Sequence, residues 1–303
     1  MLAATPSKDL TMSSISDAEL AELDARVIDM MRTGVRNEVE IIGAGEMACV
    51  IGLGDHALKR LPPVSERARL ESYGALVDEY VAALEQVGVR VAETEWRIVS
   101  SETNQVAYII QERVSAASLM PDVVRCGTET EAVALLEQVL DHVDACVLAG
   151  IGIDPQLSNW SIRDGRPLLL DITTPMLRDE KGRDRLDTEL FVAMLPALIR
   201  GFVRRFMIGE ILDKNFNRHG ILLDLIGNIV NYGLGHLTPV FLPAINARLE
   251  QPLTMKEVRA YRRSEHWTWS AIRRAFRVEQ FWKRRVLRQP TSHLLPSEYL
   301  RGD

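Results

Sequence analysis

The first third of the chain combines helical and strand-like patterns of apolar residues. Residues 16–32 carry apolar side chains at helical spacing, and Ser16 is available as an N-cap, so an amphipathic helix is expected there. From residue 39 the pattern changes to short β-prone runs separated by glycine turns, at 39–45, 47–54 and 55–61. A long helical pattern with one apolar face occupies 65–87, and two further strand candidates follow at 94–100 and 105–114.

Beyond Ser115 the pattern is mostly helical. Residues 129–150 predict a strong helix that stops at its final glycine. A loop at 151–159 leads into a tight hairpin at 160–172, whose Asp164-Gly165 pair is typical of a two-residue turn. From Asp187 onward every pattern is helical. The chain is therefore expected to be an α+β protein with its strands concentrated in the first half.

Composition and charge narrow the class of protein. The chain has 303 residues, 47% of them hydrophobic, which is enough for a substantial core. Its net charge of −6 makes a nucleic-acid partner unexpected. The three cysteines form no Cys-x-x-Cys pair, the first residues lack the pattern of a signal peptide, and no run of eighteen apolar residues occurs, so a reducing cytoplasm is expected.

One group of polar residues surrounds the predicted hairpin. Asp154 and Asn159 precede it at a spacing of five, and Asp171 follows its second apolar strand. Because Asn159 begins one strand and Asp171 ends its partner, both side chains are expected at the same edge of the hairpin. Hard oxygen ligands that converge in this way suit Mg²⁺. The alternative is three unrelated turn residues.

The order of these elements resembles the protein-kinase and aminoglycoside-phosphotransferase superfamily. A glycine turn, a lysine-bearing strand, a glutamate-bearing helix, a long helix, an Asp-x-x-x-x-Asn loop, a hairpin and an aspartate follow one another over residues 39 to 180. The resemblance implies a two-lobed fold with an antiparallel-sheet N-lobe at 39–114 and a mostly helical C-lobe at 115–303. Residues 1–38 would then be an N-terminal extension with one helix, and the C-terminal helices a second addition.

The resemblance also implies roles for individual residues. Asp154 would orient the acceptor hydroxyl or take its proton, and Asn159 and Asp171 would bind Mg²⁺. Lys59 would contact the α- and β-phosphates of ATP, although the adjacent Arg60 competes as the cation. Gly43 and Gly45 would allow backbone N–H groups to approach the phosphates, although a Gly-x-Gly turn is also common in ordinary hairpins.

Two further positions follow from the same resemblance. Glu79, twenty residues after Lys59, would be the helix glutamate, in preference to Glu66 and Glu71 near the helix start. A surface glutamate is the alternative for Glu79. The strand at 105–114 would lead into the linker between lobes, where backbone groups would face an adenine ring; the candidates are Gln111, Glu112 and Val114.

Several features depart from the family pattern. The glycine loop lacks a third glycine, no histidine precedes Asp154, and Asp171 is followed by Ile-Thr-Thr-Pro, with no Ala-Pro-Glu-like segment beyond it. The chain is therefore expected to be closer to small-molecule or otherwise atypical kinases than to eukaryotic protein kinases. The first hypothesis is an ATP- and Mg²⁺-dependent phosphotransferase acting on a hydroxyl of a small metabolite or peptide. A catalytically weak or inactive nucleotide-binding scaffold or partner subunit is the second.

The C-terminal segment 255–288 is strongly basic. It carries eleven lysines and arginines against three glutamates, interleaved with tryptophans and phenylalanines. One interpretation is a surface for an acidic partner, such as an anionic peptide, nucleic acid or membrane. The other is a pair of amphipathic helices whose aromatic residues pack on the fold and whose arginines pair with the acidic remainder. The first interpretation supplies the third hypothesis, an interaction protein with an acidic protein partner at 255–288.

Overall fold

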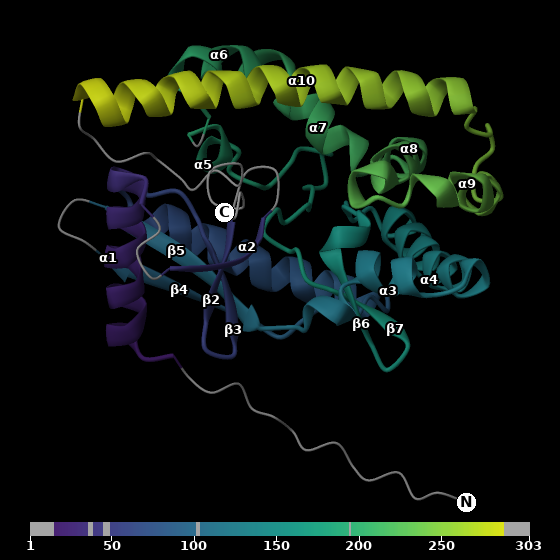
Figure 1. Cartoon of the computed structure of the whole chain (residues 1–303), viewed down its shortest axis with the longest axis horizontal. Coiled ribbons are helices and arrows are strands. Elements are labelled where there is room, and N and C mark those ends of the chain that lie inside the picture. The colour runs from purple at the N-terminus through teal and green to yellow at the C-terminus, as the bar shows by residue number, and fades with distance from the viewer. Residues whose placement is uncertain (1–14, 36–38, 45–48, 101–103, 194, 288–303) are drawn as a thin grey trace, which may run out of the picture.

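The chain is an α+β protein with one small antiparallel sheet and many helices (Figure 1). Its computed structural model describes residues 15–35, 39–44, 49–100, 104–193 and 195–287. None of the helices in this part of the chain is long and apolar enough to cross a membrane.

The first half of the chain contains the five-stranded sheet and two helices. Its elements are α1 (Asp17–Thr33), β1 (Glu40–Ala44), β2 (Cys49–Leu53), β3 (His56–Arg60), α2 (Arg67–Gln86), β4 (Thr94–Ser100) and β5 (Gln105–Glu112). Ser16 caps α1 in a capping box with Glu19, as its side chain accepts a hydrogen bond from the Glu19 N–H. The five strand runs and both helices read from the sequence are confirmed.

The strands form a five-stranded sheet in the order β1-β2-β3-β5-β4, with every pair antiparallel. Strand β5 lies between β3 and β4 and is buried on both faces. Its side chains alternate: Val106, Tyr108 and Ile110 face one core cluster, and Ala107 and Ile109 face another. The two faces of the sheet therefore belong to two separate cores.

Helix α1 covers one of these faces. Its apolar stripe packs with the inward side chains of the sheet in a cluster of its own, which includes Leu20, Leu23, Val27 and Met30 from the helix. The sequence predicts this helix as an addition to the fold, but in the structure it supplies about a third of the buried residues of one core. An open sheet face of this kind needs an apolar cover, and α1 is that cover.

A buried ion pair fastens α1 to the sheet. The Arg60 Nε lies 2.7 Å from Asp24 Oδ1, and each side chain is 6% exposed. The Tyr108 hydroxyl donates to the same carboxylate oxygen at 2.7 Å. The sequence leaves Arg60 as an alternative to Lys59 for the phosphate-binding cation. In the structure its guanidinium pairs with Asp24 of α1 instead.

The second half is mostly helical. Its elements are η1 (Ala116–Ser118), α3 (Met120–Cys126), α4 (Glu129–Leu148), η2 (Leu157–Asn159), β6 (Trp160–Arg163), β7 (Arg166–Leu169), α5 (Glu189–Val192), α6 (Ala197–Phe206), α7 (Ile208–Lys214), α8 (Arg218–Asn228), η3 (Ile229–Tyr232), η4 (Gly235–Leu237), α9 (Thr238–Asn246), α10 (Met255–Trp282) and η5 (Lys283–Leu287). The predicted hairpin forms as β6 and β7, and both residues of its turn, Asp164 and Gly165, have positive φ.

The hairpin is tied to the first half through the chain that leads into β4. Leu169 donates to the Arg90 carbonyl at 2.8 Å, and its own carbonyl accepts from the Ala92 N–H at 2.8 Å. The main core runs without a break from the inner face of α2 to α4, α8 and α9. The strand that leads to Asp171 is therefore hydrogen-bonded to the segment that enters β4.

Candidate functional site

The Lys59 ammonium and the Asp171 carboxylate meet at the centre of the candidate site. Lys59 projects from β3, and its Nζ lies 2.7 Å from Asp171 Oδ1, with 21% and 33% of the two side chains exposed. The same oxygen accepts hydrogen bonds from the Thr173 hydroxyl at 2.6 Å and the Thr173 N–H at 3.1 Å. Burial alone would raise the pKa of Asp171, but Lys59 and Thr173 outweigh it, and the pKa is lowered. Asp171 is therefore anionic at neutral pH.

Asp154 and Asn159 are joined within one short loop. The Asn159 amide donates to the Asp154 carbonyl at 3.2 Å, and Asp154 Oδ1 accepts from the Gln156 N–H at 3.1 Å. The carbonyl of Asn159 accepts from the Leu170 N–H at 2.8 Å, directly before Asp171. The structure thus brings the loop and the end of β7 together, as the spacing of the three residues predicts.

Helix α2 holds both of these segments through two tyrosines. The Tyr73 hydroxyl donates to the Thr173 carbonyl at 2.8 Å, and the Tyr80 hydroxyl donates to the Gly152 carbonyl at 2.9 Å. Burial raises the pKa of Tyr80 well above its ordinary value, and Cys146, Asp154 and Asp171 raise it further, in that order of size. Tyr80 is therefore a neutral donor beside two carboxylates.

The loop before Asp154 has no histidine but is braced in another way. Gly152 donates to the Met176 carbonyl and Ile153 to the Asn215 carbonyl, both at 3.0 Å. A Cβ on Gly152 would lie 2.7 Å from the Met176 Cβ and 2.9 Å from the Phe216 ring, so only glycine fits there. Close packing at Gly152 thus holds the backbone that carries Asp154.

A buried carboxylate, Asp224 of α8, lies close to Asp154. Asp224 is 2% exposed and accepts from Lys214 Nζ at 2.8 Å, from Gln156 Nε2 at 3.2 Å and from Asn228 Nδ2 at 3.0 Å. The Tyr261 hydroxyl of α10 also bonds to it. A polar network thus runs from the Asp154 loop through α7 and α8 to α10.

This network changes the proton affinity of Asp154. Burial raises the pKa of Asp154 to about 7, with the Asp224 and Asp171 carboxylates adding to the rise, while the Gln156 N–H and Lys214 oppose it. A carboxyl group with a pKa near neutrality can both accept and release a proton at physiological pH. Sequence reasoning missed Asp224, although an aspartate within the apolar run Ile221–Ile226 was a visible signal.

The raised pKa predicts a specific dependence of stability on pH. The unfolded carboxyl has its ordinary value of about 3.8, so between about pH 4 and about pH 7 the folded state holds a proton that the unfolded state has released. Through this group, the free energy of unfolding should fall by up to about 1.4 kcal/mol for each pH unit of increase in that window, and no further above it. Asp154→Asn removes the titration, so denaturant unfolding should show a flatter profile for the variant between about pH 5 and pH 7.

The matched control for this measurement is Asp164→Asn in the hairpin turn, where the carboxylate is exposed. Its unfolding profile should follow that of the wild type. Parallel curves for the wild type and Asp154→Asn would contradict the raised pKa.

The other residues proposed from the sequence lie in varied surroundings. Glu79 pairs with Arg185 Nη1 at 2.6 Å and is half-exposed, so the structure does not bring it to Lys59. The inner face of α2 instead presents Tyr73, Val77 and Tyr80. The sequence pattern placed Glu79 beside the buried face of the helix. In the structure the buried position is the next residue, Tyr80, and Glu79 itself lies at the edge of that face.

The candidates for the adenine contact lie at the end of β5. Gln111 is buried, and its side chain donates to Thr94 Oγ1 at 2.9 Å and to the Leu170 carbonyl at 2.8 Å. It therefore links the sheet to the residue before Asp171. Glu112 pairs with Arg163 of the hairpin at 2.7 Å. Neither backbone polar group of Val114 is hydrogen-bonded within the described part of the chain.

The structure describes one of the two candidate glycines of the predicted phosphate loop. Gly43 lies in β1 beside an irregularity in the pairing with β2, and a Cβ there would make an ordinary 3.5 Å contact with Val50. Gly45 lies outside the described residues. The geometry at Gly43 therefore does not itself require a glycine.

The oxygen atoms of Asn159 and Asp171 suit a nucleotide-borne metal ion. Across the described residues, neither Asn159 Oδ1 nor Asp171 Oδ2 accepts a hydrogen bond, because Lys59 and Thr173 bind the other oxygen of Asp171. Within the part of the chain that the structure describes, no three His, Cys, Asp or Glu side chains converge into a complete metal cage. Mg²⁺ is commonly held by one or two protein oxygen ligands together with water and phosphate, so this pair is sufficient for that mode and for no dedicated metal cage.

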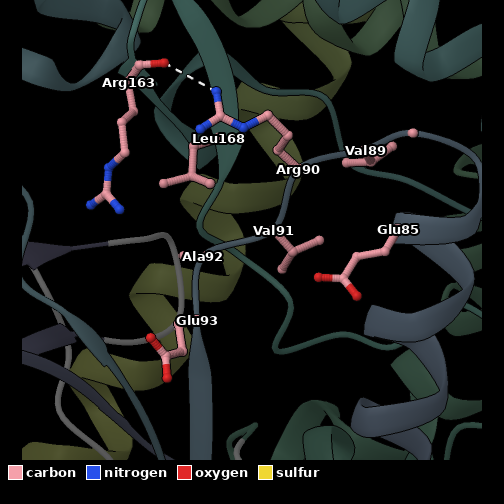
Figure 2. Close-up of a pocket in the computed structure, with 9 residues that line it drawn as sticks. Glu85, Val89, Arg90, Val91, Ala92, Glu93, Arg163 and Leu168 are labelled. Atoms are coloured by element: carbon pink, nitrogen blue, oxygen red, sulfur yellow. Dashed lines mark hydrogen bonds between the residues drawn. The ribbon is translucent and has the colours of Figure 1, made fainter. Parts of the chain in front are cut away.

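An open hollow of about 540 Å³ lies elsewhere on the surface (Figure 2). It is lined by the end of α2, the segment before β4 and the β6–β7 hairpin, and Arg90 donates across it to the Arg163 carbonyl at 3.1 Å. None of the candidate residues contributes to its lining. The hollow is therefore separate from the Lys59–Asp171 site.

Comparison with known families identifies the family of the chain. A family model covers residues 48–280, which is most of the sequence and includes every candidate residue from Lys59 to Asp171. The chain belongs to the DUF6206 family, a family of unknown function. Comparison with curated proteins gave no match. The function of this DUF6206 protein must therefore be inferred from the chemistry of its own site.

Proposed function

We propose that this protein is an ATP- and Mg²⁺-dependent phosphotransferase with a two-lobed, protein-kinase-like fold that acts on a hydroxyl group of a small metabolite or peptide. The observation that carries the proposal is the 2.7 Å ion pair between Lys59 and Asp171, two residues 112 positions apart. The resemblance assigns these residues to the phosphates and to the metal, and their meeting is what such a site needs. The order of three strands, a helix, two strands, two helices and a hairpin supports the same fold.

Each candidate residue would have a separate role in phosphoryl transfer. Lys59 would bind the phosphates of ATP, and Asn159 Oδ1 and Asp171 Oδ2 would hold Mg²⁺. The metal, when bound, would neutralise charge on the phosphate oxygens. Asp154 would take the proton of the acceptor hydroxyl as its oxygen forms the new bond to the γ-phosphorus and the bond to ADP breaks. A pKa near 7 suits that role, because the base is then partly ionised at neutral pH and still holds a transferred proton.

Nucleotide binding is the first test of this proposal. With ATP and Mg²⁺ at a hundred times the dissociation constant, the wild-type protein should gain about 2.7 kcal/mol of stability in thermal unfolding. Chelation of Mg²⁺ with EDTA should remove most of that gain. An unfolding curve that ATP and Mg²⁺ leave unchanged, together with no heat of binding in titration calorimetry, would refute the proposal.

A second candidate function is nucleotide binding without transfer. The observation that favours it is the pairing of Glu79 with Arg185, because active protein kinases need a lysine–glutamate pair between the strand and the helix. Incubation with γ-labelled ATP and pools of hydroxyl-bearing metabolites or peptides separates the two. Metal-dependent binding with labelled product supports the phosphotransferase, and the same binding without product under any acceptor supports the second candidate.

A further inference from the structure

Helix α10 has two faces of different character. It runs as one long helix along an edge of the molecule, opposite the β6–β7 hairpin (Figure 1). Its inner face, with Val258, Ile272 and Phe276, is buried against α6 and α8. Burial of Phe276 and partial burial of Trp269 agree with the packing interpretation of the sequence. The remaining aromatic residues do not agree with it.

The outer face of α10 exposes large apolar side chains. Trp267, Phe281 and Trp282 are 66%, 64% and 56% exposed, and Val278 is similarly open. Positions 267, 274, 278 and 281 repeat at helical spacing, so they form one stripe opposite the buried face. Three aromatic side chains of this size exposed on one helix cost hydration free energy unless another surface covers them.

The same outer face is basic and carries no acid. Arg263, Arg274 and Arg277 are exposed, and none of them forms an ion pair within the described residues. The three glutamates of the helix are engaged elsewhere: Glu257 caps the helix start, Glu265 bonds to Tyr261, and Glu279 pairs with Lys283. The expected pairing of these arginines with the acidic remainder of the chain is therefore not formed.

We propose that the outer face of α10 and the following η5, from Arg263 to Leu287, docks on an anionic lipid surface. Interleaved arginines and exposed tryptophan and phenylalanine side chains are the combination by which helices lie at the boundary between headgroups and acyl chains. The arginines attract the headgroups, and the apolar side chains enter the boundary region. Val286 and Leu287, also exposed, extend the apolar end of this face. Nucleic acid fits less well, because it would leave these aliphatic side chains against water and phosphate.

Co-sedimentation of the full chain with lipid vesicles tests this proposal. The protein should bind vesicles of phosphatidylcholine that contain phosphatidylserine, should bind pure phosphatidylcholine vesicles weakly, and should dissociate as salt is added. Arg274→Glu/Arg277→Glu should weaken binding by at least about 25-fold, since each basic group contributes about fivefold. Phe281→Ser/Trp282→Ser should weaken it by about tenfold or more for each residue.

The matched control is Leu148→Ser/Arg166→Glu, which changes exposed residues of α4 and of the hairpin, away from α10. All three variants alter exposed side chains, so their thermal unfolding should match that of the wild type. The control should bind vesicles as the wild type does. Wild-type protein that ignores phosphatidylserine vesicles, equal losses in the control, or binding to an RNA oligonucleotide or to polyglutamate in place of vesicles would each overturn the proposal.

Discussion

Asp171→Asn should abolish the metal-dependent part of nucleotide binding and, with it, any phosphoryl transfer. The substitution keeps the size of the side chain but removes the negative charge of the carboxylate whose Oδ2 would hold Mg²⁺ beside Asn159. A bound metal ion supplies several kcal/mol of transition-state stabilisation in such reactions, so the rate of phosphoryl transfer should fall by at least about a hundredfold. Titration calorimetry with ATP, in the presence and absence of Mg²⁺, measures the loss of metal-dependent binding directly.

The same variant carries an internal test against simple misfolding. Asp171 is the ion-pair partner that the described residues provide for Lys59. In Asp171→Asn the lysine loses this competitor, so binding of ATP without Mg²⁺ should be maintained or increase. Loss of both kinds of binding would point to disruption of the fold and not to a missing metal ligand.

Asp164→Asn is the control for this experiment. It lies seven residues earlier on the same hairpin, is exposed, and has a positive φ that asparagine adopts readily. Its Mg²⁺-dependent binding should equal that of the wild type. If Asp164→Asn and Asp171→Asn lose binding equally, the assignment of Asp171 to the metal is wrong.

Asp24→Ala should be the most destabilising change on α1, costing about 3–5 kcal/mol of unfolding free energy. It leaves Arg60 buried with no carboxylate, and a guanidinium does not relieve this by losing its proton. It also removes the acceptor of the buried Tyr108 hydroxyl. Denaturant unfolding, with the midpoint and slope both recorded, measures the loss.

Two comparisons isolate the buried charge as the cause. Glu71→Ala breaks an exposed pair with Arg67 on α2 and should change stability by no more than about 1 kcal/mol. Asp24→Leu/Arg60→Met removes both charges at once and should be less destabilised than Asp24→Ala. Equal effects of Asp24→Ala and Glu71→Ala would show that burial of Arg60 is not the cause.

The local structure of this chain was largely predictable from its sequence. Capping boxes at Ser16, Thr128 and Thr254 mark three helix starts, and the alternation in β5 separates the side chains of its two faces. The spacing of Asp154, Asn159 and Asp171 correctly placed them at one end of a hairpin. These features succeed because each depends on residues only a few positions apart.

The partners of the site residues were less predictable. Helical spacing placed Glu79 next to the buried face, but it does not distinguish a residue at the edge of that face from one at its centre. In the structure Tyr73 and Tyr80 lie at the centre of the buried face of α2, and their hydroxyls donate to backbone carbonyls on both sides of the candidate site. The proton affinity of Asp154 depends first on its burial and then on Asp224, seventy residues away, which no local pattern connects to it.

The sequence by itself determined the order of the elements, most of their boundaries and the residues that we propose for a metal and a phosphate. Only the tertiary structure decided that α1 is the cover of the sheet, that Lys59 meets Asp171, and that the aromatic residues of α10 divide between a buried and an exposed face. Periodicity identifies an apolar face but not the surface that it contacts. That contact depends on packing between segments that are far apart in the chain. Burial and charge interactions depend on how close two groups lie in the folded protein, and not on how close they are in the sequence.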